Sequence, residues 1–273
     1  MRQVEERYIS LLTDFGFKRI FGTAINKDLL ICFLNSLFAG KQVVKDVSYL
    51  NPEHVGDVYT DRKAIFDVYC EGENGEKFIV EMQNAHQTYF KDRSLFYSTF
   101  PIREQAALLN FDMNEEAFEK EKIRHSVQLC DTATHKVFYD KLEFIYVEIA
   151  KFNKSLEELE TLYDKWLYAL KNLYKLTQRP KELCDKVFDR LFEEAEIAKF
   201  TPQELREYEA SKIAYRDIKN SVDTAKREGI AEGMEKKSHE IAKKMLTKGM
   251  DEATVMEITG LPAELIQQLK AEM

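Results

Sequence analysis

The sequence predicts an α/β protein of the mixed α+β kind, in which strands and helices alternate first and helices alone follow. Apolar and β-branched residues fill 62–70 and 77–83 on either side of a glycine-containing turn, which indicates a β-hairpin. An apolar stripe with helical spacing runs through 26–39. Helical periodicity then continues from Ser155 onward, so the C-terminal part is expected to be all-helical.

The N-terminal region contains signals for two helices and a strand. Thr13 is a suitable N-cap and Gly22 a suitable stop, so a short helix is expected over 14–21. A second helix is expected over 26–39, and residues 43–50 read as a strand. The apolar stripe of the second helix consists of Leu29, Leu30, Phe33, Leu34, Leu37 and Phe38.

Later elements follow from the same patterns, and they divide the chain into three expected parts. Helices are expected over 87 to about 107, 181–199 and 202–228, and strands over 122–131 and 142–151. The expected parts are a core over 1–152, a helical extension packed on it over 153–228, and a helical hairpin over 229–273.

The hairpin at the C-terminus has helix-turn-helix spacing around Gly260-Leu261-Pro262. Lys270 is the only basic residue on its second helix, which argues against reading of the DNA major groove. A packing or dimerisation element, and hence a possible homodimer, is the favoured interpretation.

Composition limits the class of protein. The chain has 273 residues, is 44% hydrophobic and 32% charged, and carries a net charge of −8, which counts against a protein that merely coats nucleic acid. The charged start and the lack of a long apolar run predict a cytoplasmic protein without a signal peptide or membrane span. Its four cysteines are scattered without a CxxC pair, which predicts reduced thiols and no zinc site.

The predicted hairpin carries two acids where strand propensity disfavours them. Asp67 lies in the first strand and Glu81 in the second, each among apolar neighbours. Residues that break a local rule in this way are expected at functional sites.

The length of the turn decides whether the two acids meet. A two-residue turn at Asn74-Gly75 would place Asp67 opposite Met82. A three-residue loop over 73–75, with Gly75 left-handed, would place Asp67 opposite Glu81 and Glu71 opposite Lys77. The second register is favoured because it pairs opposite charges, and its facing acids then require a cation or a shared proton. A hard divalent cation suits such oxygen ligands.

These residues resemble the PD-(D/E)XK nuclease superfamily, and nearly the whole chain is similar to the recombination-promoting nuclease group, the PD-(D/E)XK nuclease family transposases. The stretches that carry the resemblance are Thr13-Asp14-Phe15-Gly16-Phe17-Lys18-Arg19-Ile20-Phe21-Gly22, Phe66-Asp67-Val68, Val80-Glu81-Met82-Gln83, Arg93-Ser94-Leu95-Phe96-Tyr97-Ser98, Glu148-Ile149-Ala150-Lys151-Phe152 and Asp164-Lys165-Trp166-Leu167. The resemblance implies a restriction-endonuclease-like mixed sheet flanked by helices.

The resemblance also implies a metal site and a DNA substrate. Asp67 and Glu81 would hold Mg²⁺ or another divalent cation such as Mn²⁺ or Ca²⁺. Gln83 stands where the superfamily often has lysine, and it can orient water or phosphate but cannot titrate. Asp14 is either a further acid near the metal or a helix-start acid.

The substrate contacts implied by the resemblance come from four residues. Lys18 would contact the DNA backbone, and Arg93, Tyr97 and Gln105 would line a helix beside the site. The chain departs from the family after Gln105, where the turn and most of the strand that the family normally has are absent before Leu109, which puts activity in doubt.

Two functions follow as hypotheses. The first is a metal-dependent DNA endonuclease that hydrolyses phosphodiester bonds in recombination, mobile-element activity or phage defence. The alternative is a catalytically degenerate nuclease fold that acts as a DNA-binding or protein-interaction module. A ribonuclease-H-like transposase is a poorer third option, because no third acid has the required separation.

Overall fold

The computed structural model describes residues 6–38, 40, 42–50, 53–54, 64–65, 67–73, 75–84, 104–113 and 118–271. The described chain divides into two compact units, Met1–Arg216 and Asp217–Met273.

The first unit begins with helices and then forms a sheet. Helix α1 spans Asp14–Phe21, a 3-10 turn spans Ala24–Asn26, and α2 spans Lys27–Phe38. The strands are β1 (Val47–Tyr49), β2 (Glu53–His54), β3 (Ala64–Ile65), β4 (Val68–Gly72), β5 (Lys77–Gln83), β6 (Glu104–Leu109), β7 (Arg124–Cys130) and β8 (Val137–Glu148). Helices α4 (Leu162–Asn172) and α5 (Lys186–Glu194) follow, and α6 spans Pro202–Thr247.

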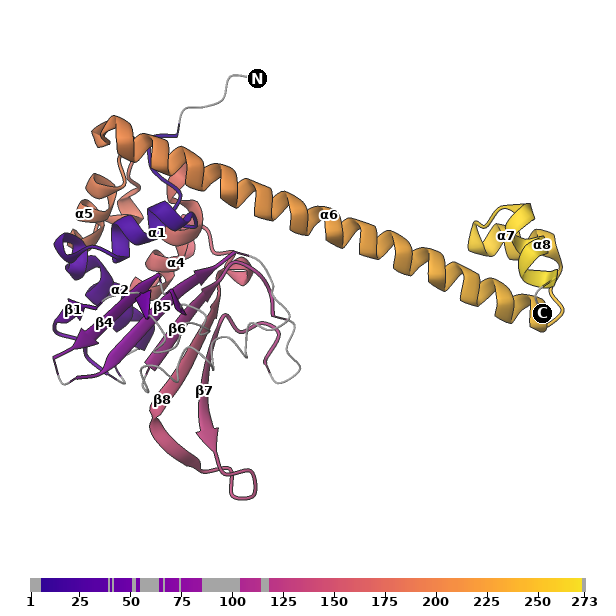
Figure 1. Cartoon of the computed structure of the whole chain (residues 1–273), viewed down its shortest axis with the longest axis horizontal. Helices are drawn as coiled ribbons and strands as arrows, with labels where there is room; N and C mark the ends of the chain where they lie inside the picture. Colours follow the sequence, from indigo (N-terminus) through magenta and orange to yellow (C-terminus); the bar gives the residue numbers. More distant parts are fainter. Residues whose placement is uncertain are drawn as a thin grey trace. The chain divides into compact units, whose positions relative to one another are not determined.

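The described strands form a mixed six-stranded sheet in the order β1-β4-β5-β6-β8-β7, with β2 and β3 paired separately (Figure 1). Strands β5, β6 and β8 are parallel neighbours, whereas β1–β4, β4–β5 and β7–β8 are antiparallel. The carboxyl ends of the three parallel strands therefore meet at one edge. The expected fold class, a mixed sheet with helices and a helical C-terminal part, is confirmed.

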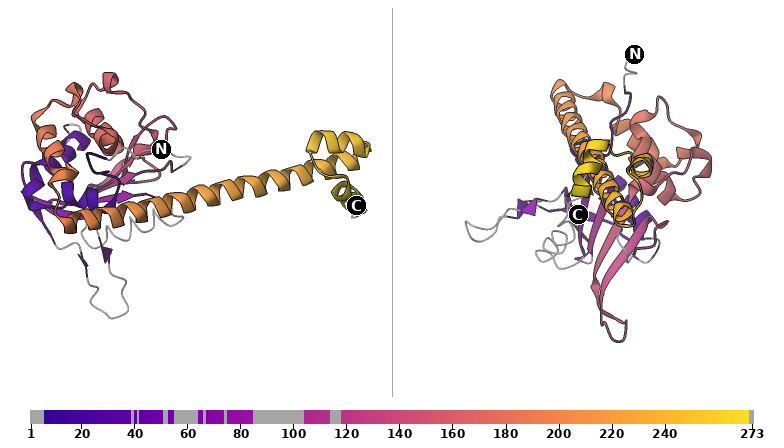
Figure 2. Two further views of the ribbon diagram at one scale, coloured as in Figure 1. Left: turned by 90° about the horizontal axis from the view of Figure 1, so that it is seen from above. Right: turned by 90° about the vertical axis from the view of Figure 1, so that its right-hand side faces the viewer.

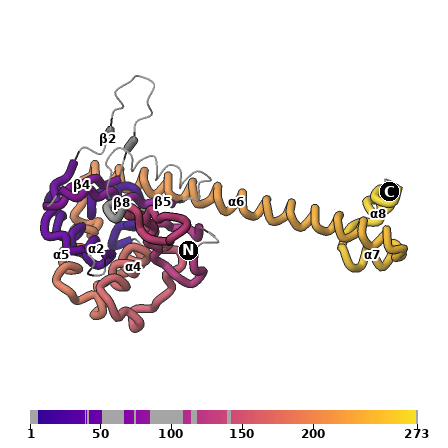
Figure 3. The backbone as a smooth tube through the Cα atoms, turned by 90° about the horizontal axis from the view of Figure 1, so that it is seen from below, coloured from indigo at the N-terminus to yellow at the C-terminus, as the bar shows by residue number. Residues whose placement is uncertain are grey.

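Helices α1, α2, α4 and α5 pack with the sheet into one large core. Trp166 on α4 is fully buried, and its ring contacts Phe21, Phe33 and Phe188 from three other helices. Helix α2 contacts both α4 and α5 (Figure 3). Strands β7 and β8 run beyond the other strands as a long hairpin (Figure 2).

Helix α1 forms where the sequence predicts it. The hydroxyl of Thr13 accepts a hydrogen bond from the backbone N–H of Gly16 at 3.1 Å, and the backbone N–H of Gly22 bonds the carbonyl of Lys18. Phe17, Ile20 and Phe21 are buried, so one face of the helix is fixed in the core. The opposite face is left for polar residues.

Three predicted elements are corrected. The strand expected over 43–50 is shorter, because only Val47–Tyr49 pairs with β4. Residues 104–107 belong to strand β6 rather than to a helix. Because β6 lies between β5 and β8, the expectation that the sheet lacks a strand after Gln105 is wrong. The apolar run Ala106-Ala107-Leu108-Leu109 suits such a central strand. Helix α6 continues through Gly229 and Gly233 instead of ending at 228.

The beginning of α6 is stabilised by hydrogen bonds between Thr201 and the carboxylate of Glu204. Glu204 accepts hydrogen bonds from the backbone N–H and the hydroxyl of Thr201, both at 2.8 Å, and it also pairs with Arg19 on α1. These bonds, with the backbone N–H of Thr201 contributing most, lower the pKa of Glu204 from 4.5 to about 2.

This lowered pKa predicts an acid-sensitive contribution to stability. A depressed carboxyl pKa stabilises the fold above the unfolded value of 4.5, and this contribution disappears as pH falls toward 2. We therefore expect Glu204→Gln to destabilise the first unit at neutral pH but to cost progressively less below pH 4.5. Urea unfolding of the wild type and of the Glu204→Gln variant, from neutral pH down to pH 2, measures this difference in the free energy of unfolding. Glu207→Gln, on the next turn, is the control, and an equal pH dependence in the two variants would contradict the prediction.

The second unit contains the rest of α6, followed by α7 (Glu252–Thr259) and α8 (Ala263–Ala271). Asp251 caps α7 through the backbone N–H of Thr254, and Gly260 ends it with a left-handed φ of 69°. The predicted pair of short helices is confirmed. Their shared core consists of Ala242, Met245, Val255, Ile266 and Leu269.

None of the described helices is by itself both long and apolar enough to cross a membrane. Helix α1 and the helical segment Ala24–Phe38 meet the length and composition criteria only when taken together, with a bend of 63° between them.

Candidate functional site

The β4–β5 hairpin has the register that the three-residue loop predicts. Val68 pairs with Val80, and Glu71 pairs with Lys77. Gly75 has a left-handed φ of 81°, as the loop requires. The Glu71 and Lys77 side chains form the expected ion pair. Continued by one residue past Val68, the same register places Asp67 across from Glu81.

The side chain of Asp67 lies against strand β5. Its Oδ2 accepts a hydrogen bond from the backbone N–H of Met82 at 2.8 Å. Its Oδ1 lies 3.9 Å from the Nζ of Lys18 on α1. The Asp67 side chain is 24% exposed, so it remains accessible to a ligand.

Glu81 sits in β5 and is only 6% exposed. Its neighbours Val80 and Phe78 belong to the large core, whereas Ile79 packs with Tyr69 in a separate small cluster. Side chains alternate along a strand, so Glu81 shares the face of Ile79 and lies opposite the Val80 face. A carboxylate at this depth is costly unless positive charge or hydrogen bonds compensate it.

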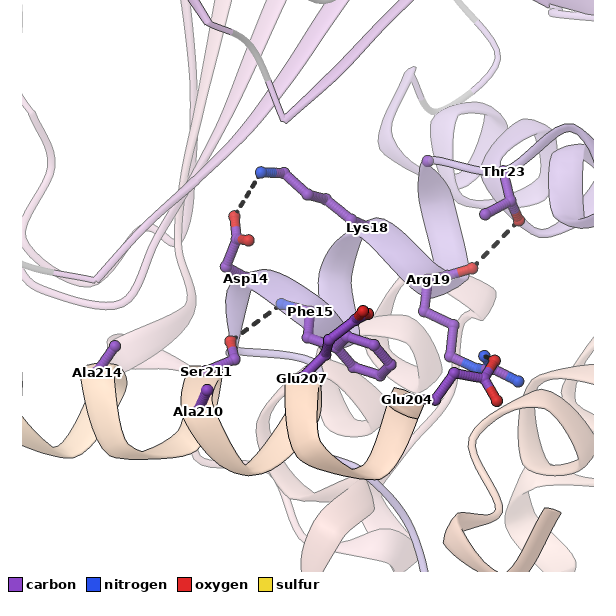
Figure 4. Close-up of a pocket in the computed structure, with 11 residues that line it drawn as sticks. Asp14, Phe15, Lys18, Arg19, Thr23, Glu204, Glu207, Ala210, Ser211 and Ala214 are labelled. Carbon is purple, nitrogen blue, oxygen red and sulfur yellow. Dashed lines mark hydrogen bonds and ion pairs between the residues drawn. The ribbon is translucent and has the colours of Figure 1, made fainter. Parts of the chain in front are cut away.

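Lys18 connects two carboxylates. Its Nζ lies 2.7 Å from Oδ1 of Asp14, one helical turn earlier (Figure 4). The same Nζ lies 3.9 Å from Oδ1 of Asp67. The Asp14 side chain is 65% exposed, and that of Lys18 is 42% exposed. The position of Asp14 beside the first turn of α1 is also favourable for the helix dipole.

A groove of about 740 Å³ lies along α1 next to Lys18 (Figure 4). Its lining includes Asp14, Phe15, Lys18 and Arg19 from α1 and Glu204, Glu207, Ala210, Ser211 and Ala214 from the beginning of α6. The hydroxyl of Ser211 accepts a hydrogen bond from the backbone N–H of Phe15 at 3.0 Å, which joins the two walls.

The other predicted site residues fall in different places. Gln83 ends β5, at the carboxyl edge of the parallel strands, and its carbonyl accepts a hydrogen bond from the backbone N–H of Asn110 at 3.0 Å. The expectation that Gln105 lies on a helix is wrong, because it lies on β6 opposite Ile79. Arg93 and Tyr97 lie outside the described residues.

A family model described as "PD-(D/E)XK nuclease family transposase" matches residues 11–225, which is more than half of the chain. The chain belongs to this family. The match covers α1, the β4–β5 hairpin and the whole six-stranded sheet, so the resemblance seen in the sequence is confirmed. Neither the curated proteins nor the solved structures gave a match.

A second family model, described as "Rpn/YhgA-like nuclease family, C-terminal HTH domain", matches residues 235–271. It covers the end of α6 together with α7 and α8. A helix-turn-helix domain in this family points to DNA as a partner. The scarcity of basic residues on the second helix had instead favoured packing or dimerisation for this hairpin. Dimerisation through this region stays a prediction.

Divalent metals are typical of PD-(D/E)XK nucleases, and the residues of this chain fit a hard cation. Carboxylate oxygens of Asp67 and Glu81 are the donors that such ions prefer. The ammonium of Lys18 already lies beside Asp67, so this position favours positive charge. Among the described residues, no group of three or more His, Cys, Asp and Glu side chains forms a ready-made metal cluster. A bound ion would therefore complete its coordination with backbone, water or substrate oxygens.

The structure also shows a buried polar cluster around Glu148, one of the residues that carry the family resemblance. Glu148, at the end of β8, is fully buried and accepts hydrogen bonds from the backbone N–H of Met113 at 2.6 Å and from Lys151 at 2.7 Å. His125 lies 3.1 Å from its second oxygen. The sequence contained a signal for this cluster, since Glu148 is an acid at the end of an apolar strand. The contacts favour a structural role, because they join β7, β8 and the segment after β6.

Proposed function

We propose that this family member is a metal-dependent DNA endonuclease in which Asp67 and Glu81 hold Mg²⁺ or a similar divalent cation such as Mn²⁺ or Ca²⁺. The observation that supports it most is the hairpin register, which brings an acid at the start of β4 to the position facing a buried acid in β5. A buried acid facing another acid is unfavourable in a merely structural sheet, so a cation explains the pair.

The remaining residues have roles that follow from their chemistry. A bound divalent ion would supply Lewis acidity and a more acidic water ligand. Gln83 does not titrate, so it can orient water or a phosphate oxygen but cannot remove a proton. The backbone carbonyl of Met82 is a further candidate ligand.

Positive charge near the site comes from α1 rather than from β5. Lys18 lies 3.9 Å from Asp67 and is partly exposed, so its ammonium can pair with a phosphate of the DNA backbone. Asp14 orients Lys18 through their 2.7 Å ion pair, and it remains a candidate for a further contact to the metal. Arg93, Tyr97 and Gln105 remain predicted substrate contacts.

The C-terminal helix-turn-helix domain gives the protein a second region that can hold DNA. On α8, Gln267 and Gln268 are exposed, and glutamine can bond the edge of adenine in the major groove. Such a domain would recruit the nuclease unit to its substrate. Recombination, mobile-element activity and phage defence are the biological settings that we propose for this activity.

Incubation of the purified full chain with supercoiled plasmid tests the proposal. We expect nicked and linear DNA with Mg²⁺ and intact supercoiled DNA with EDTA. Titration of Mg²⁺ or Mn²⁺ by calorimetry gives an independent readout. A folded chain that binds DNA but neither binds a divalent ion nor cleaves would overturn the endonuclease and favour the DNA-binding module instead.

A further inference from the structure

The part of α6 that follows Arg216 carries exposed apolar residues. Ile218 is 43% exposed and Val222 is 41% exposed. Ala225, Gly229 and Gly233 continue from them at intervals of three and four residues, so all five lie on one face of a helix with 3.6 residues per turn. We call these five residues the α6 stripe. No described residue of the second unit covers it.

No contact with the described part of the chain requires the two glycines of the stripe. Glycine is the poorest helix former after proline, yet α6 continues through both positions. A Cβ added at Gly229 or Gly233 would meet no atom within 4 Å. Their lack of a side chain is thus unnecessary for packing inside one copy. It would matter where a second helix approaches the backbone closely.

Charges flank the stripe asymmetrically. Because successive residues are 100° apart, residues preceding the stripe members lie on one side and residues following them lie on the other. The preceding side carries Asp217, Glu228 and Glu232, whereas the following side carries Lys219 and Lys226, with Asp223 as the exception. The stripe therefore separates an acidic side from a mainly basic one.

This asymmetry determines which partner and which orientation fit. In a parallel helix pair, the side that precedes the seam in one copy faces the side that follows it in the other. In the parallel arrangement, the acidic side of each copy therefore faces the mainly basic side of the other. In an antiparallel pair each side faces its own kind, so like charges would meet. DNA fits poorly, because the stripe is apolar and one flank is acidic.

We propose that the α6 stripe is the seam of a parallel homodimer, in which Gly229 and Gly233 allow the two helices to approach closely. The homodimer expected from the C-terminal helices thereby receives a defined surface. Parallel pairing would also bring two helix-turn-helix hairpins to the same end, and dimers of such domains read two half-sites. This inference does not depend on nuclease activity.

Matched substitutions in the full chain test the seam. Ala225 lies in the stripe, whereas Ala231 is another exposed alanine on the far side of the same helix. We expect Ala225→Glu to raise the dimer dissociation constant by roughly tenfold or more, because it places a charge in the apolar seam. Ala231→Glu should leave the dimer intact. Sedimentation velocity at micromolar concentration measures both.

Gly229→Leu separates dimerisation from folding. It should increase helicity by circular dichroism, since leucine is the better helix former and has room within one copy. It should nevertheless weaken the dimer. Gain of helicity together with an unchanged dimer would overturn the proposal, and so would a wild-type chain that stays monomeric at high micromolar concentration.

Disulfide formation tests the orientation. In a parallel pair Ile218 faces its own copy, so Ile218→Cys should give a covalent dimer under mild oxidation in a non-reducing gel. An antiparallel pair would bring Ile218 near Gly233 of the other copy and give none. The wild type, with its four native cysteines, sets the background. Cross-linking no greater than that background would overturn the parallel arrangement.

Discussion

Asp67→Asn and Glu81→Gln should each abolish Mg²⁺-dependent DNA cleavage while the fold persists. Each change removes a negative oxygen donor but keeps the size of the side chain. The expected loss exceeds the roughly 10- to 100-fold typical of groups one step removed from a metal. Because both acids would hold the same ion in the proposed site, the double variant should be little worse than either single variant.

The structure indicates why folding should survive. The Oδ1 of an asparagine at position 67 can still accept the hydrogen bond that Met82 now donates to Asp67 at 2.8 Å. At position 81, glutamine removes a buried negative charge, which by itself relieves the cost of desolvation. Thermal melts of both variants should therefore lie close to that of the wild type.

Glu71→Gln is the matched control for these variants. Glu71 is an acid on the same hairpin, but it pairs with Lys77 near the turn. Its removal should leave cleavage unchanged. Plasmid cleavage rates of the wild type and all variants, measured with and without Mg²⁺, test this expectation. Wild-type rates in both the Asp67 and the Glu81 variants would eliminate the proposed metal site.

The hairpin that carries the candidate site could be predicted because its determinants are local in sequence. The Glu71–Lys77 charge pair and the glycine at 75 fixed the choice of register, and the structure has that register. Thr13 and Gly22 likewise marked both ends of α1. Turn chemistry and caps act over a few residues, so they can be recognised without knowledge of the fold.

Features that depend on residues distant in the sequence could not be predicted from local patterns. Residues 104–109 form a strand because they lie between β5 and β8, and a short apolar run alone does not distinguish a buried strand from a helix. The contact between Lys18 and Asp67 joins residues 49 positions apart, and no local pattern announces it. The resemblance assigned Lys18 to the DNA backbone and Asp67 to the metal ion, but only the structure shows that the two residues are neighbours.

Gly16→Ala should be the most destabilising small substitution in the first unit. A Cβ at Gly16 would lie 2.1 Å from the backbone oxygen of Ser10 and 2.9 Å from Oγ1 of Thr13. The first of these atoms belongs to the backbone, and Ser10 is also held by a hydrogen bond from its N–H to the hydroxyl of Tyr208 at 3.0 Å. Because the Ser10 backbone cannot move away easily, the clash must be relieved by a shift of α1.

The expected loss is about 3 kcal/mol, at the upper end of the range for overpacking a tight site. Thermal or urea unfolding measures it. The shift should also impair cleavage, because α1 carries both Asp14 and Lys18, although neither residue is changed. The N-cap bond from Gly16 to Thr13, at 3.1 Å, would be strained by the same movement.

Gly72→Ala provides the same substitution in the same unit with a different environment. Its Cβ would meet Oε2 of Glu76 at 2.8 Å and the ring of Phe78 at 3.1 Å, and both are outer atoms of side chains. The Glu76 carboxylate can rotate away, so the loss should be well below that at Gly16. Equal unfolding free energies for the two variants would show that the contact with the Ser10 carbonyl does not constrain α1. The hydrogen-bonded connection from Tyr208 through Ser10 to α1 would then have no part in positioning Lys18 beside Asp67.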